Sequence, residues 1–114
     1  MRLINQTKNL VLANQVFFAG TLFKRIKGLL GQKVFLPGQG IVICPCNSVH
    51  TFFMHFAIDV LFVDSNYRVI KVFSNLAPNR ITGIYWRSKR VIELPAGTLA
   101  LSNTQNKDQL QFLE

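Results

Sequence analysis

Hydrophobic and polar positions along the chain follow a helical period in one segment and a strand-like pattern in most others. In the helical segment, which runs from Thr21 to Gly31, apolar residues fall at positions i, i+1, i+4, i+7 and i+8 and therefore share one face. Thr21 is a suitable N-cap and Gly31 a suitable C-terminal stop. The pattern predicts one main helix over about residues 21–31.

The other apolar residues form short runs between turn signals, which is typical of strands. The range Thr7–Phe18 predicts one strand, or two short strands broken near Asn14. Alternation over Val49–Phe56 predicts a central strand with His50 on one face and His55 on the other. Five further strands are predicted over residues 41–44, 60–64, 67–73, 90–94 and 109–112.

Turn-forming residues predict how the strands are connected. Asp64-Ser65-Asn66 predicts a hairpin turn in which Asn66 takes the left-handed conformation. Residues 76–90, with Pro78 and Gly83, are predicted to be irregular. Six or more short strands with one helix indicate an α+β fold: a compact, β-rich, mostly antiparallel, barrel-like sheet with one main helix.

Length and composition restrict the class of protein. We expect the 114 residues to form a single domain, residues 1–114, and an apolar content of 49% argues against disorder. The N-terminus lacks the apolar run of a signal peptide, and no stretch approaches the ~20 apolar residues of a membrane span. A disulfide between Cys44 and Cys46 would be strained, so two free thiols and a cytoplasmic location are expected.

The charge is strongly positive, with a net value of +8 and a pI near 10.1. Such a surface favours an acidic protein, an anionic ligand or nucleic acid as the partner, although it can also serve solubility alone.

Four segments resemble, in order and spacing, the family called domain of unknown function 192. They are Ala19–Leu29 (A-x-T-x-x-x-R-x-x-G-L), Cys46–Met54 (C-N-S-V-H-T-x-x-M), Ile58–Asp64 (I-D-V-x-F-x-D) and Val91–Gly97 (resembling V-L-E-L-P-A-G). The resemblance, which runs from about residue 10 to 112, implies a small β-rich domain and supplies no established activity.

The sequence departs from that family pattern in two respects. Many relatives have a Gly-Asp pair near the C-terminus where this chain has Lys107-Asp108, so the turn before the last strand is expected to differ. Many relatives also carry an export or lipoprotein segment, and an extracytoplasmic role is not carried over to this chain.

The densest group of chemically active side chains lies between Cys44 and Asp59. Cys44, Cys46, His50 and His55 are all soft metal ligands, but their spacing matches no known metal loop, and neither a metal site nor a cofactor is predicted. Buried thiols and structural histidines explain the same residues.

His50, Thr51 and Asp59 form a candidate acid–base or ligand-binding group, in which Cys46 could act as nucleophile. The alternative is structural, because Asp59 can accept backbone N–H groups at a turn. Glu93 lies in an apolar strand and either pairs with Arg25 or faces solvent.

A second candidate lies in the irregular segment, where aromatic and basic residues interleave: Tyr85, Trp86, Arg87, Lys89 and Arg90. This composition is typical of surfaces that stack bases or bind phosphates, and also of an ordinary loop anchored by Trp86. We take Trp86, Arg87 and Arg90 as candidate ligand-binding residues.

Three functions therefore stay open at the level of sequence. The first is a non-enzymatic binding or accessory module for an acidic or anionic partner. The second is a small hydrolase-like enzyme that uses His50 and Asp59 with Cys46, and the third is a thiol or zinc binder.

Overall fold

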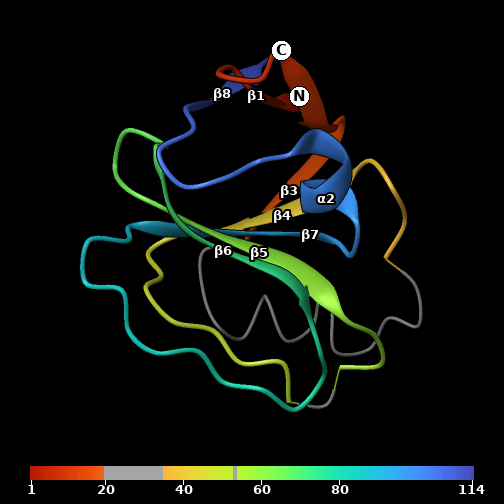
Figure 1. Ribbon diagram of the computed structural model, residues 1–114, viewed down its shortest axis with the longest axis vertical. Helices are drawn as coiled ribbons and strands as arrows, with labels where there is room; N and C mark the ends of the chain where they lie inside the picture. The colour runs from red at the N-terminus through yellow and green to blue at the C-terminus, as the bar shows by residue number, and fades with distance from the viewer. Residues whose placement is uncertain (20–34, 53) are drawn as a thin grey trace.

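The computed structural model describes residues 1–19, 35–52 and 54–114, which form two β-sheets and one short helix (Figure 1). The helix predicted over residues 21–31 lies outside the described residues, as does Arg25. None of the helices in the described part of the chain is long and apolar enough to cross a membrane.

A three-stranded sheet joins the two ends of the chain. Strand β1 (Arg2–Asn5) pairs antiparallel with both β2 (Leu10–Ala13) and β8 (Leu110–Leu113). Both termini consequently lie at the top of Figure 1. The predicted break near Asn14 is confirmed, because Asn14 separates β2 from the next strand. Strand β1 itself was not predicted, since its four residues carry too short a pattern.

The larger sheet has five strands in the order β3-β4-β7-β5-β6. Their bounds are β3 Gln15–Ala19, β4 Gln39–Ile43, β5 Ile58–Val63, β6 Val69–Leu76 and β7 Arg90–Pro95. Strands β3 and β4 run parallel, and the other neighbours run antiparallel. The predicted strands in these ranges are confirmed, as is the β-rich, mostly antiparallel α+β class.

The prediction of a barrel-like sheet is wrong, because the described strands form two open sheets. The reason is visible in β5, where all six residues are buried, so the five-stranded sheet is covered on both faces. One face packs against the three-stranded sheet and helix α2 (Thr98–Ser102). The other packs against irregular segments that include Val49, Met54 and Tyr85. A layered arrangement satisfies both apolar faces without closure.

The strand predicted over Val49–Phe56 is also wrong. Its described residues contribute only an isolated bridge, between His50 and Ile81. Strand β5 already has β6 and β7 as its two neighbours, so no position beside it is left for this segment. Alternation therefore does not set the exposure of its side chains: Met54 is buried while Phe52 is exposed.

Two local details differ from the sequence expectation. In the β5–β6 hairpin, Tyr67 rather than Asn66 has the positive φ, of 62°. The Oδ1 atom of Asp64 accepts the N–H groups of both Asn66 and Arg68, and this bonding moves the left-handed position one residue along. Helix α2 was missed because five residues are too few to display a helical period.

Candidate functional site

The two candidate regions of the sequence lie against each other in the structure. We call residues 44–52 the motif segment and residues 77–89 the basic segment. Backbone hydrogen bonds join them at several points, including Thr51 N to Arg80 O (2.8 Å), Thr82 N to Val49 O (2.9 Å) and Tyr85 N to Asn47 O (2.9 Å). Figure 1 shows both segments on the side of the five-stranded sheet that faces away from the termini.

Thr51 is the main side-chain link between the two segments. It is fully buried, and its hydroxyl donates to the carbonyl of Ala77 (2.6 Å) and accepts the N–H of Arg80 (2.9 Å). A hydroxyl engaged in this way positions backbone rather than ligand.

His50 and Cys46 line one cleft of about 210 Å³, together with Ile43, Pro45, Ser48 and Ile81. His50 is half-buried, and its ring stacks on Phe52 with centroids 5.4 Å apart. The thiol of Cys46 donates to the carbonyl of Ser48 at 3.1 Å. His50 and Cys46 therefore line the same cleft, whereas Thr51 and Asp59, the other members of the group proposed from the sequence, do not.

Asp59 does not line this cleft, and its hydrogen bonds are made to other elements. It is fully buried on β5; its Oδ1 accepts the N–H of Asn75 (2.7 Å), and its Oδ2 accepts the N–H of Leu99 (2.8 Å). Each carboxylate oxygen is thus used by a backbone amide, one from β6 and one from α2. This arrangement supports the structural role that the sequence also allowed.

The remaining soft ligands of the motif are dispersed. Cys44 and His55 are exposed, and no disulfide joins Cys44 to Cys46. Within residues 1–19, 35–52 and 54–114, no three His, Cys, Asp or Glu side chains gather closely enough to hold a metal ion.

Glu93 is fully buried on β7, opposite Ile41 on one neighbouring strand and Val60 on the other. Its side chain is therefore not solvent-facing, which excludes one of the two sequence alternatives. Arg25, the partner proposed from the sequence, lies outside the described residues.

The aromatic residues of the basic segment divide between core and surface. The ring of Tyr85 packs on Phe62, with centroids 4.6 Å apart, whereas Trp86 is 77% exposed. The sequence had proposed Trp86 as the anchor of the loop, but Tyr85 has that position. Arg87 is exposed.

Arg90 is held in place by contacts with the β5–β6 hairpin. Its guanidinium carbon lies 4.5 Å from the ring centroid of Tyr67, and its Nη1 donates to the carbonyl of Ser65 at 3.3 Å. Burial raises the pKa of the Tyr67 phenol, and the nearby positive charge of Arg90 offsets only part of that rise.

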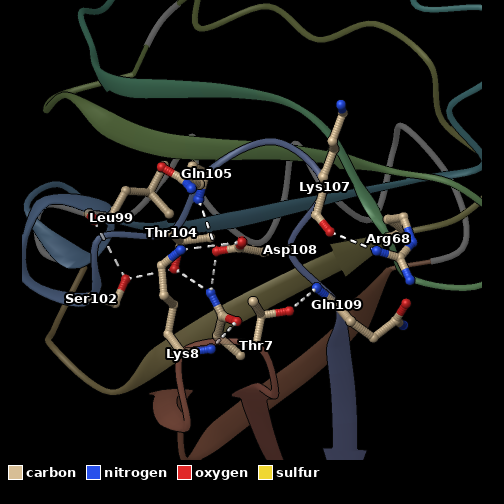
Figure 2. Close-up of polar contacts among 11 residues, drawn as sticks. Thr7, Lys8, Arg68, Leu99, Ser102, Thr104, Gln105, Lys107, Asp108 and Gln109 are labelled. Atoms are coloured by element: carbon tan, nitrogen blue, oxygen red, sulfur yellow. Dashed lines mark hydrogen bonds and ion pairs between the residues drawn. The ribbon is translucent and has the colours of Figure 1, made fainter.

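A second cleft, of about 400 Å³, lies beside the β5–β6 hairpin. We call it the hairpin cleft. Its polar lining consists of Asp64, Arg68, Arg87, Asn106 and Lys107. Figure 2 shows Arg68 beside the backbone of Lys107, whose carbonyl accepts a hydrogen bond from the Arg68 Nη1 at 2.7 Å. Of these residues, only Arg87 was among the sequence candidates. The one sequence feature that had marked Lys107 was its position in the family pattern, where the resemblance has Gly.

Sequence comparison decides the family. The model of the family DUF192, described as "Uncharacterized ACR", matches residues 3–112. The protein belongs to this family. A UPF0127 protein of Pyrococcus horikoshii is 39% identical to the DUF192 chain over 101 residues, which cover 83% of this chain and 84% of the relative. A UPF0127 protein of Thermococcus sibiricus is 32% identical over 96% of this chain and 73% of the relative.

A solved structure also shares the fold of this DUF192 protein. It is a protein of unknown function from Novosphingobium aromaticivorans, with a TM-score of 0.83, 18% identity and coverage of 98% of this chain and 84% of that chain. The resemblance inferred from four short motifs is therefore confirmed, and the family has no established activity.

Proposed function

We propose that this DUF192 protein is a non-enzymatic binding module for an acidic protein partner, and that the basic segment is its docking surface. The observation that carries the proposal is the exposure of large apolar and cationic side chains on one segment. Trp86 is 77% exposed, Ile81 72% and Ile84 51%. Arg80, Arg87 and Lys89 are exposed on the same segment.

The charge of this surface is not balanced by carboxylates of its own sequence. No Asp or Glu occurs between Asp64 and Glu93, a stretch that contains six Lys and Arg residues. A cationic surface of this kind attracts acidic partners and raises their association rate. A cytoplasmic location belongs to the same proposal, because two cysteines without a disulfide between them suit a reducing compartment.

The apolar residues favour a protein over a nucleic acid as the partner. Bases stack on aromatic rings, and Ile81 and Ile84 offer none. Exposed Trp and aliphatic side chains are instead the usual centre of a protein interface, with Arg among the residues enriched there.

The surface is also fixed before any partner arrives. Hydrogen bonds from Thr51, Thr82 and Tyr85 hold the basic segment on the motif segment, and Ser88 donates through its hydroxyl to the carbonyl of Cys46 at 3.0 Å. A preformed surface loses less conformational entropy on binding than a free loop.

The single tryptophan of the chain is a direct reporter for the test, because it is Trp86 itself. Its fluorescence is followed while the protein is titrated with a soluble Glu/Tyr copolymer, with polyglutamate and with a single-stranded oligonucleotide of matched charge. We expect a blue shift and the tightest binding with the copolymer, and weaker binding as salt is raised.

Substitutions that leave Trp86 in place show which residues form the docking surface. Ile84→Ser and Arg80→Gln should each weaken copolymer binding, whereas Arg2→Gln, which removes the same charge from the exposed first residue of β1, should not. Tighter binding of the oligonucleotide, or equal losses for Arg80→Gln and Arg2→Gln, would contradict the proposal.

We retain a hydrolase-like enzyme as the second proposal, because His50 and Cys46 line one cleft. Asp59 does not line that cleft, so the proposal rests on the imidazole and the thiol. Ester and thioester substrates are the test, and His50→Ala and Cys46→Ala must abolish any turnover that is found.

A further inference from the structure

The hairpin cleft has the features of an anion site, and we propose that it binds a small phosphate monoester. This inference goes beyond docking of an acidic protein and does not depend on it. Three basic residues, Arg68, Arg87 and Lys107, are among the residues that line this cleft. They come from three different parts of the chain: the hairpin turn, the basic segment and the turn before β8.

The charge balance of the cleft is positive. Its one carboxylate is Asp64, and the Oδ1 atom of that carboxylate already accepts the N–H groups of Asn66 (2.8 Å) and Arg68 (3.0 Å). A concave surface lined by basic residues concentrates a positive field, which favours the binding of an anion. A phosphate monoester carries close to two negative charges and three acceptor oxygens, which suits three cations better than a single carboxylate does.

Arg68 is held in position for such a ligand. Its Nη1 donates to the carbonyl of Lys107 at 2.7 Å, and its backbone N–H is held by Asp64. The guanidinium has five N–H donors in a planar fork, so this contact leaves donors for an anion. Because the side chain is already oriented, less conformational entropy is lost when a ligand binds.

Lys107 gives an independent observation. Its φ is +77°, in the left-handed region that favours glycine. A lysine in this conformation is strained by about 1–2 kcal/mol relative to the usual backbone. Strained residues of this kind concentrate at functional sites. The strained turn places Lys107 among the residues that line the cleft, where glycine would bring no charge.

The cleft has the size of a small-ligand site. Its volume of about 400 Å³ is within the range of about 300–1,000 Å³ usual for such sites. Asn106 adds an amide donor to the lining, and two apolar residues of β6, Val69 and Ile70, complete it. A compact ester with an uncharged organic part fits this combination.

The test uses the full chain labelled with ¹⁵N and titrated with inorganic phosphate, glycerol 3-phosphate and, as the uncharged control, glycerol. We expect amide shifts around Arg68 and Asn106 with both phosphates and none with glycerol. A larger affinity for the ester than for inorganic phosphate would assign the organic part to the cleft. Shifts confined to other regions would overturn the proposal.

Two variants distinguish binding in the hairpin cleft from a general effect of net positive charge. Arg87→Gln should weaken phosphate binding about tenfold, the usual effect of losing one charge-assisted hydrogen bond. Arg80→Gln is the matched control, because it removes the same charge from an exposed arginine that does not line the cleft. Equal losses in the two variants would show that only net charge matters and would overturn the proposal.

Two more variants change the cleft in opposite directions. Lys107→Gly should weaken phosphate binding severalfold while the protein stays folded, and Asp64→Asn should strengthen it severalfold by removing the opposing charge. Docking of the acidic copolymer should be unaffected by Lys107→Gly and reduced by Arg80→Gln. Each variant therefore affects one assay and not the other. Loss of the Lys107→Gly effect on phosphate binding would count against the phosphate site, and loss of the Arg80→Gln effect on copolymer binding would count against the docking surface.

Discussion

Two residues of this protein have a left-handed backbone conformation that their side chains disfavour. Among the described residues with positive φ that are neither glycine nor asparagine, only Tyr67 and Lys107 are found, and both border the β5–β6 hairpin or the turn before β8. The left-handed region disfavours such side chains, so each position lowers the stability of the fold locally.

Lys107→Gly is predicted to increase the free energy of unfolding by up to about 1 kcal/mol. Relief of the left-handed strain stabilises the folded state, while the greater freedom of glycine in the unfolded chain offsets part of the gain. Urea unfolding measures the change. Lys107→Ala, which keeps the Cβ atom, is the control and should differ from the native protein by less than about 0.5 kcal/mol. A less stable Lys107→Gly protein would show that the side chain contributes more than its backbone strain costs.

At the scale of elements, the polar residues of the family motif connect pieces of structure. Asp59 joins β5 to β6 and to the start of α2, and Thr51 joins the motif segment to the basic segment. These connections explain why rare polar residues occur in an otherwise apolar stretch. They also show why proximity in sequence suggested a catalytic group: the same residue types serve both purposes.

Asp59→Asn is predicted to destabilise the protein by about 2–3 kcal/mol. One carboxylate oxygen becomes an NH₂ group that faces a backbone N–H, so a buried donor loses its acceptor. Thermal unfolding followed by circular dichroism is the measurement. Asp64→Asn is a matched control, because a single oxygen of Asp64 accepts both of its amide hydrogen bonds and asparagine keeps that oxygen. Similar losses in the two variants would contradict this account of Asp59.

At the scale of the whole molecule, a buried polar network fastens the start of the chain to its end. Asn5 donates through its amide to Asp108 Oδ2 (2.9 Å) and to Thr104 Oγ1 (3.0 Å), and Lys8 Nζ lies 3.3 Å from Asp108 Oδ1. Figure 2 shows Lys8, Thr104 and Asp108 converging between β1 and the turn before β8. The three-stranded sheet is therefore held by charge as well as by strand pairing.

This network predicts a loss of stability in acid. Burial raises the pKa of Asp108, but hydrogen bonds from Asn5 and Gln105 and the charge of Lys8 outweigh that effect and lower it from 3.8. Because the folded pKa is the lower one, the stabilisation is present above pH 3.8 and disappears as pH falls through the folded value.

Asp108→Asn tests the same network at neutral pH, where it should cost about 2–3 kcal/mol. The difference from the native protein should shrink as pH falls below 3.8, and guanidinium unfolding at several pH values measures it. Lys8→Gln should cost less than about 1 kcal/mol, since the Lys8 side chain is partly exposed. A constant difference at all pH values would exclude Asp108 as the titrating group.

The sequence by itself determined the family, the β-rich class, the extent of most strands and the residues that carry unusual chemistry. These follow from local pattern: the continuous apolar run that ends in Val63 indicates a strand, and four motifs in order identify relatives. Only the tertiary structure decided that the described residues of Val49–Phe56 form no strand of a sheet, because the backbone of this segment bonds to the basic segment instead. It also decided which polar groups meet. Asp59 bonds to backbone amides of β6 and α2, and Arg68, Arg87 and Lys107 line one cleft, because pairing between distant strands brings these segments together. A one-dimensional pattern does not contain those non-local contacts.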